Sequence, residues 1–121
     1  MKSISLSTGE WLLVVVPKDA ICEIVNFENL KVWVRWYTPS FSDNGNIDLP
    51  PGQWSIVGKP LELSEEICKT IVRVTIIQGS TFGTDYQNKK AFKRSAKESL
   101  LSLVESEGFE PETTLILKKI I

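Results

Sequence analysis

The stretch Trp11-Leu12-Leu13-Val14-Val15-Val16 is the longest uninterrupted apolar run in the chain, and Pro17 ends it. A short run that closes on three consecutive β-branched valines favours a β-strand. The run is far shorter than the ~20 apolar residues that a membrane-spanning helix needs. It therefore predicts a strand that enters the core of a globular protein.

Further strands are predicted on both sides of this run. Ile4 and Leu6 alternate with serines, and residues 20–27, 31–37 and 53–57 have the composition of strands. Between the last two lies a segment, 39–51, built largely from Ser, Asp, Asn, Gly and Pro. We expect this segment to be a loop that turns at Asn44-Gly45, because both residues tolerate a positive φ.

The second half of the chain changes to helical signals. Ser64-Glu65-Glu66 is typical of a helix start, since the serine can cap and the carboxylates lie near the positive end of the helix dipole. Residues 74–77 suggest a short strand, and 78–88 read as a loop. A long helix is predicted over about 90–107, and a final strand over 114–121. The apolar stripe of the predicted helix consists of Phe92, Ala96, Leu100, Leu103 and Val104.

Strands that cluster early and a long helix that comes late argue against alternating parallel βαβ units. The sequence therefore predicts a single α+β domain over residues 1–121. We expect a mostly antiparallel sheet of five or six strands, with the long helix packed across one face and a short second helix.

Two segments resemble each other. Gly9-Glu10-Trp11-Leu12-Leu13-Val14 is similar to Gly52-Gln53-Trp54-Ser55-Ile56-Val57, and a proline follows each at the same distance. Duplication and convergence on a good strand start explain this equally well, because a repeat architecture needs three or more units.

The overall composition restricts the class of protein. The 121 residues are 42% hydrophobic and 24% charged, values typical of a globular domain with a real core. The net charge is −1, from 14 basic and 15 acidic residues, whereas non-specific nucleic-acid binders carry excess positive charge. The first residues lack the apolar stretch of a signal peptide, so we expect an intracellular protein.

Histidine is absent from the sequence, which contains two cysteines, Cys22 and Cys68. Without imidazole, Ser-His-Asp and Cys-His catalysis and every histidine metal site are excluded. Two thiols cannot form a four-thiolate zinc site. We therefore expect no metal or cofactor, and predict that both cysteines are buried free thiols.

The strand 31–37 is the best candidate for a functional surface. Alternation places Trp33, Arg35 and Tyr37 on one side of the strand. Trp, Tyr and Arg are the residue types most enriched at interaction hot spots. The other side carries Val32, Val34 and Trp36. The plainer interpretation is a sheet wall whose aromatic face is covered by the long helix.

Two other groups of residues offer alternatives. Asp85 and Tyr86, in a glycine-containing segment, are the candidates for a small enzyme with carboxylate or tyrosine chemistry, although such an Asp commonly caps a turn. A basic cluster could contact a phosphate backbone, or it could be a solvated helix face. The cluster consists of Lys89, Lys90, Lys93, Arg94 and Lys97.

Several motifs, in order, resemble a group of small phage and prophage proteins of unknown function. The resemblance begins with Leu49-Pro50-Pro51-Gly52-Gln53-Trp54 and continues with Leu63-Ser64-Glu65-Glu66. Gly83-Thr84-Asp85-Tyr86 and Ala96-Lys97-Glu98-Ser99-Leu100 follow, and Leu115-Ile116-Leu117-Lys118-Lys119 closes it. It implies a phage or prophage origin and a place in the cytoplasm of a bacterial host cell, and it supplies no catalytic residue.

These observations favour a non-enzymatic phage or prophage accessory protein. We expect it to act by binding a protein partner or by self-association, with Trp33, Arg35 and Tyr37 as the binding residues. Nucleic acid is a less favoured partner, and no membrane partner is expected.

Overall fold

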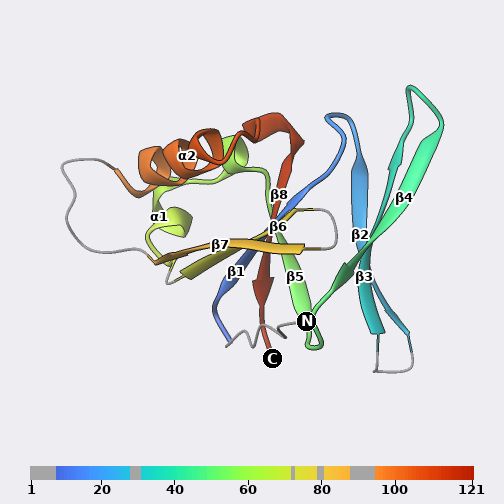
Figure 1. Cartoon of the computed structure of the whole chain (residues 1–121), viewed down its shortest axis with the longest axis horizontal. Coiled ribbons are helices and arrows are strands. Elements are labelled where there is room, and N and C mark those ends of the chain that lie inside the picture. Colours follow the sequence, from blue (N-terminus) through green and yellow to red (C-terminus); the bar gives the residue numbers. More distant parts are fainter. Residues whose placement is uncertain (1–7, 28–30, 72, 79–80, 88–94) are drawn as a thin grey trace.

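The computed structural model describes residues 8–27, 31–71, 73–78, 81–87 and 95–121, and it has three layers (Figure 1). A five-stranded sheet forms the middle layer. A three-stranded sheet lies against one of its faces, and the helices lie against the other. The α+β class predicted from the sequence is confirmed, but the strands are divided between two sheets and do not form one.

The middle sheet has the strand order β5-β8-β1-β6-β7. The apolar run at the N-terminal end becomes β1 (Trp11–Val15), which lies at the centre of the sheet. β1 pairs in parallel with β6 (Arg73–Gln78) and antiparallel with β8 (Thr114–Lys119). The edges are β5 (Trp54–Gly58) and β7 (Thr81–Gln87), each antiparallel to its neighbour. The sheet is therefore mixed.

The second sheet is an antiparallel meander of β2 (Ile21–Phe27), β3 (Lys31–Thr38) and β4 (Asp43–Leu49). Its inner face packs on the middle sheet through Val32, Val34 and Leu49, which meet Leu12 and Leu117. The single predicted sheet is wrong for a packing reason. Both faces of β1 must be covered because Leu12 and Leu13, at successive positions, are each fully buried.

Two segments predicted as loops are strands. The segment 39–51 contains β4, in which Asn44 and Gly45 pair with Tyr37 and Trp36 and form no turn. Gly45 is needed for space: a Cβ built there would lie 2.6 Å from Cζ2 of Trp36. The chain turns earlier, where Ser42 has a φ of 51°. The segment 78–88 contains β7.

The helical layer consists of two α-helices and two 3-10 turns. α1 (Glu65–Cys68) begins after the capping residue Ser64, as predicted. α2 (Ala96–Ser106) begins after Ser95, whose hydroxyl accepts from the amide of Glu98. The predicted start at residue 90 is therefore too early, and residues 90–94, with Phe92 of the stripe, lie outside the described part of the chain. The turns are η1 (Pro60–Glu62) and η2 (Pro111–Thr113).

The apolar stripe of α2 faces the middle sheet. Leu100, Leu103 and Val104 are buried in the same cluster as Trp11 and Leu13, which confirms that the helix packs on a sheet face. Ala96 packs against this cluster from its margin.

The two similar segments found in the sequence become β1 and β5, which flank β8 on either side. Trp11 lies opposite Lys118, whereas Trp54 lies opposite Lys119. A shift of one residue moves a side chain to the other face of a sheet. Trp11 accordingly packs on the helical side and Trp54 between the two sheets, so the segments share a start but not an orientation.

Candidate functional site

The outer face of the three-stranded sheet carries the residues that the sequence pointed to. Val32 and Val34 are 5% and 0% exposed on the inner face, and Trp36 is half-buried against the same core. Tyr37 is 51% exposed, Arg35 is exposed and Trp33 is half-buried. The alternation predicted along β3 is therefore present in the structure.

The register of the strands arranges this face in four rows. Residues that are directly opposite in an antiparallel pair lie on the same face, so each row joins neighbours across the sheet. The rows are Phe27–Lys31, Val25–Trp33–Asp48, Glu23–Arg35–Asn46 and Ile21–Tyr37–Asn44. We call the surface formed by the residues of these four rows the outer face.

A cross-strand ion pair lies in the middle of the outer face. Nε and Nη2 of Arg35 both donate to Oε1 of Glu23. The side chains are 59% and 56% exposed, so the pair remains in contact with solvent. Sequence reasoning identified Arg35 but missed Glu23, because only the register of β2 against β3 shows that the two are neighbours.

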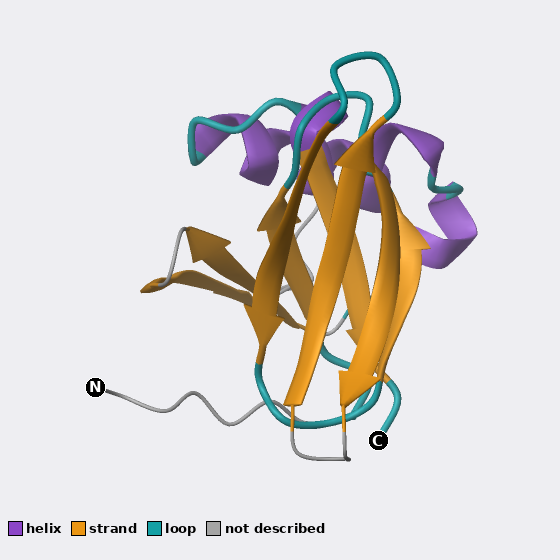
Figure 2. Ribbon diagram, turned by 90° about the vertical axis from the view of Figure 1, so that its right-hand side faces the viewer, coloured by secondary structure: helices purple, strands orange, loops and turns teal. Residues whose placement is uncertain are grey.

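Apolar side chains lie on both sides of this ion pair. Ile21 and Phe27 are 49% and 55% exposed, and the rings of Phe27 and Trp33 are tilted against each other with centroids 6.3 Å apart. β4 contributes polar groups instead, namely Asn44, Asn46 and Asp48. Figure 2 looks onto this face, with the helices on the far side of the molecule. The long helix therefore does not cover it, contrary to the plainer interpretation of the aromatic strand.

The other sequence candidates do not form a comparable site. Asp85 and Tyr86 are consecutive positions of the edge strand β7, opposite Thr75 and Val74. In the basic cluster, Lys97 donates through Nζ to the carbonyl of Leu61 at 3.0 Å. The rest of that cluster, at 89, 90, 93 and 94, lies outside the described residues.

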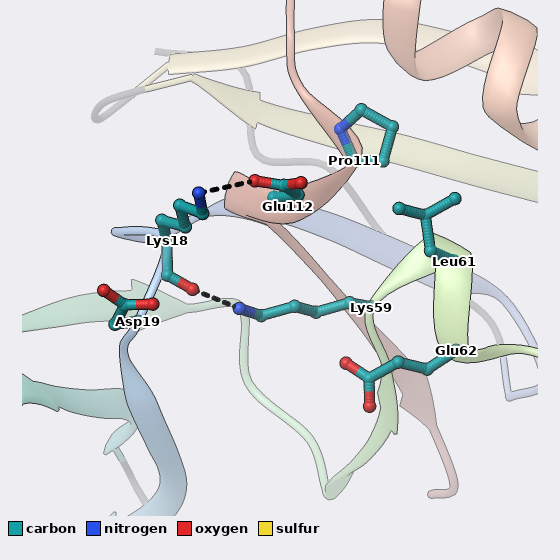
Figure 3. A pocket seen from close by; sticks show the side chains of 7 residues that line it. All are labelled: Lys18, Asp19, Lys59, Leu61, Glu62, Pro111 and Glu112. Carbon is teal, nitrogen blue, oxygen red and sulfur yellow. Dashed lines mark hydrogen bonds and ion pairs between the residues drawn. The ribbon is translucent and has the colours of Figure 1, made fainter.

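A pocket of about 230 Å³ opens where the turn between β1 and β2 meets η1 and η2 (Figure 3). Nζ of Lys18 lies 3.3 Å from Oε2 of Glu112, which raises the pKa of the lysine. Nζ of Lys59 reaches across and donates to the carbonyl of Lys18 at 2.6 Å. These charged side chains are therefore already engaged with one another, so the pocket is a weaker candidate than the outer face. Asp19, Leu61, Glu62 and Pro111 complete the lining.

Both cysteines are free thiols in the structure. Cys68, the last residue of α1, is fully buried in the core between the helices and the middle sheet, whereas Cys22 is only half-buried at the edge of the core between the two sheets. Burial raises the pKa of both thiols. The prediction of two free thiols is confirmed, and the prediction that both are buried holds only for Cys68.

Among the described residues, no helix is both long and apolar enough to cross a membrane. Comparison of the chain with protein-family models, curated proteins and solved structures finds no significant match. A function for this chain is therefore inferred from the geometry of the outer face.

Proposed function

We propose that this is a non-enzymatic protein that acts by protein–protein binding through the outer face. The observation that carries the proposal is a group of exposed or half-exposed aromatic and aliphatic side chains on one face of the three-stranded sheet, whose opposite face is buried in the core. Such side chains would lose contact with water on binding, and this is the main favourable term in protein association.

The sheet makes these side chains well suited to binding. Trp33 and Tyr37 stand on a strand whose alternate residues, Val32 and Val34, are anchored in the core. Rigid aromatic rings on a fixed backbone lose little conformational entropy when a partner packs on them. Arg35, held by Glu23, is likewise preorganised and can stack or form forked hydrogen bonds.

The resemblance to small phage and prophage proteins of unknown function adds the proposal that the chain is an accessory protein in a bacterial host cell. The enzymatic alternative gains no comparable support, because Asp85 and Tyr86 are known only as backbone positions of the edge strand β7. The nucleic-acid alternative is weakened at Lys97, whose ammonium group is engaged by the backbone of η1.

The test compares Trp33→Ala with Phe41→Ala. Phe41 is a matched control, since it is an aromatic residue 77% exposed in the turn between β3 and β4 and belongs to none of the four rows. The immobilised wild-type protein should retain a partner from a bacterial host lysate, or a second copy of itself. Trp33→Ala should weaken this association by at least ~1–2 kcal/mol, while Phe41→Ala leaves it unchanged.

Thermal unfolding of both variants serves as the folding control. An unfolded Trp33→Ala protein would show that Trp33 belongs to the core, and a folded one with undiminished association would place binding elsewhere. Either result would overturn the proposed function.

A further inference from the structure

We infer that the partner on the outer face is a second copy of this chain, packed face to face in a two-fold symmetric dimer. This inference rests on the proposed function and names its partner. It comes from the order of side chains in the four rows, which is complementary to itself.

The complementarity follows from one symmetry operation. A two-fold axis parallel to the strands, midway between β2 and β3, brings β2 of one copy over β3 of the other. Each row then faces the same row of the second copy, with its two ends exchanged. A two-fold contact requires this kind of self-complementary patch.

The row that contains Glu23 and Arg35 shows the match in charge. Glu23 of one copy lies over Arg35 of the second copy, and Arg35 lies over Glu23, so the two ion pairs combine into a network of alternating sign. Because each copy already pairs these two groups, this row buries no unpaired charge, which would be costly.

The rows on either side show the match in shape. Trp33 of one copy lies over Val25 of the other, and Tyr37 lies over Ile21, so that a ring packs on an aliphatic side chain in each row. At the end of the face, Lys31 lies over the ring of Phe27, where a cation can interact with an aromatic face. Packed sheets cross at roughly −30°, so the rows nearest the centre match best.

β4, whose side chains on the outer face are polar, lies at the rim of the proposed interface. With the axis between β2 and β3, the side chains of β4 fall at the rim of the contact, and interfaces combine an apolar centre with a polar rim. Across the whole outer face, Lys31 and Arg35 are balanced by Glu23 and Asp48. A strongly charged partner would therefore find no complementary field, whereas a second copy is matched in sign.

The size of the face sets the expected strength. Strands of seven or eight residues are roughly 25 Å long, and the two strands that overlap in the dimer, β2 and β3, span roughly 10 Å. This footprint is smaller than the ~800 Å² per partner of a standard interface. We therefore expect a concentration-dependent dimer and not a permanent one.

Sedimentation of the wild-type protein from roughly 1 µM to 1 mM should show a monomer–dimer equilibrium. Glu23→Arg and Arg35→Glu each place like charges opposite each other across the contact, so each variant alone should dimerise at least about tenfold more weakly. The two variants mixed in equal amounts should associate as well as the wild type, because arginines of one then face glutamates of the other. Glu66→Arg, which makes the same change of charge at a side chain 86% exposed on α1, away from the contact, is the matched control and should have a small effect.

Repulsion within a single chain could also disturb folding, and the exchanged variant E23R/R35E addresses this. It keeps the ion pair within each chain and the complementarity between chains, so it should dimerise like the wild type. A monomeric wild-type protein at all concentrations, or single variants that dimerise normally, would overturn the inference. A monomer that still retains a partner in a Trp33-dependent way would refute the second copy while the proposed function stands.

Discussion

The two sheets differ in how many of their faces are covered. In the five-stranded sheet, the consecutive residues Leu12 and Leu13 are both fully buried, one against the second sheet and one against the helices. In the three-stranded sheet, Val34 is fully buried but its neighbour Arg35 is exposed. Apolar burial is therefore concentrated in the middle sheet, whereas the outer face of the three-stranded sheet keeps Arg35 and Tyr37 exposed.

The largest expected effect concerns the helical cover of the middle sheet. Leu100→Ala or Leu103→Ala removes side chains that are 2% and 7% exposed, and each should lower the free energy of unfolding by about 2–5 kcal/mol. Ile67→Ala, at a position 41% exposed on α1, is the control and should cost much less. Denaturant unfolding measures all three, and values near zero at both leucines would show that α2 is not packed on the sheet.

A smaller loss of stability is expected at the inner face of the three-stranded sheet. Gly45→Ala forces a Cβ against the indole of Trp36 and should destabilise the protein by about 1–3 kcal/mol. Asn46→Ala, at the next position of β4 but on the outer face, should be nearly neutral. Combining Gly45→Ala with Trp36→Val should recover part of the loss in a double-mutant cycle. Strict additivity would argue against the contact.

The attachment of α2 to α1 should make stability depend on pH. The carboxylate of Glu65 accepts from the amides of Ala96 and Lys97 at 2.7 and 3.0 Å, and the Lys97 and Ala96 bonds hold its pKa below the usual 4.5. The resulting stabilisation is complete above pH 4.5, where the carboxyl of the unfolded chain is ionised. It is lost as the pH falls from there through the lowered pKa of the folded state.

Glu65→Gln should therefore lower the thermal midpoint near neutral pH, and the difference from the wild type should shrink in acid. Glu66→Gln is the matched control, since Glu66 makes only an exposed contact with Lys69 at 3.6 Å. A deficit of Glu65→Gln that is the same at neutral and acidic pH would rule out the ionised carboxylate as its cause.

The smallest expected difference compares the two thiols in the native protein. Cys22, half-buried in the three-stranded sheet, should react with a thiol reagent faster than Cys68, which is fully buried between α1 and the middle sheet. Both should react fully in denaturant. Equal native rates would mean that the helical layer opens as readily as the edge of the core between the sheets.

Local signals in the sequence predicted several features correctly. The alternation along β3, the capping serine before α1 and the stripe of Leu100, Leu103 and Val104 depend on residues two to four positions apart. Such signals act within one strand or one turn of helix, so they can be recognised without knowledge of the fold. The same is true of β1, whose apolar run already indicated a strand in the core.

The errors concern residues that are far apart in the sequence. Asn44-Gly45 has the composition of a turn, but Trp36 in the neighbouring strand needs the space that Gly45 leaves. The segment 78–88 is recruited as β7 by pairing with β6, against its own composition. Tertiary contacts therefore overrode local propensity at both segments.

Patterns along the chain were enough to establish the α+β class, the absence of histidine chemistry and the separation of Trp33, Arg35 and Tyr37 from the inner side of β3. The division into two sheets, the parallel pairing of β1 with β6 and the contact of Arg35 with Glu23 became visible only in the folded chain. Periodicity records which side of a strand is apolar, whereas the choice of a partner strand depends on packing between distant segments. The candidate surface combines the two, because alternation along one strand selects its residues and the register across three strands arranges them.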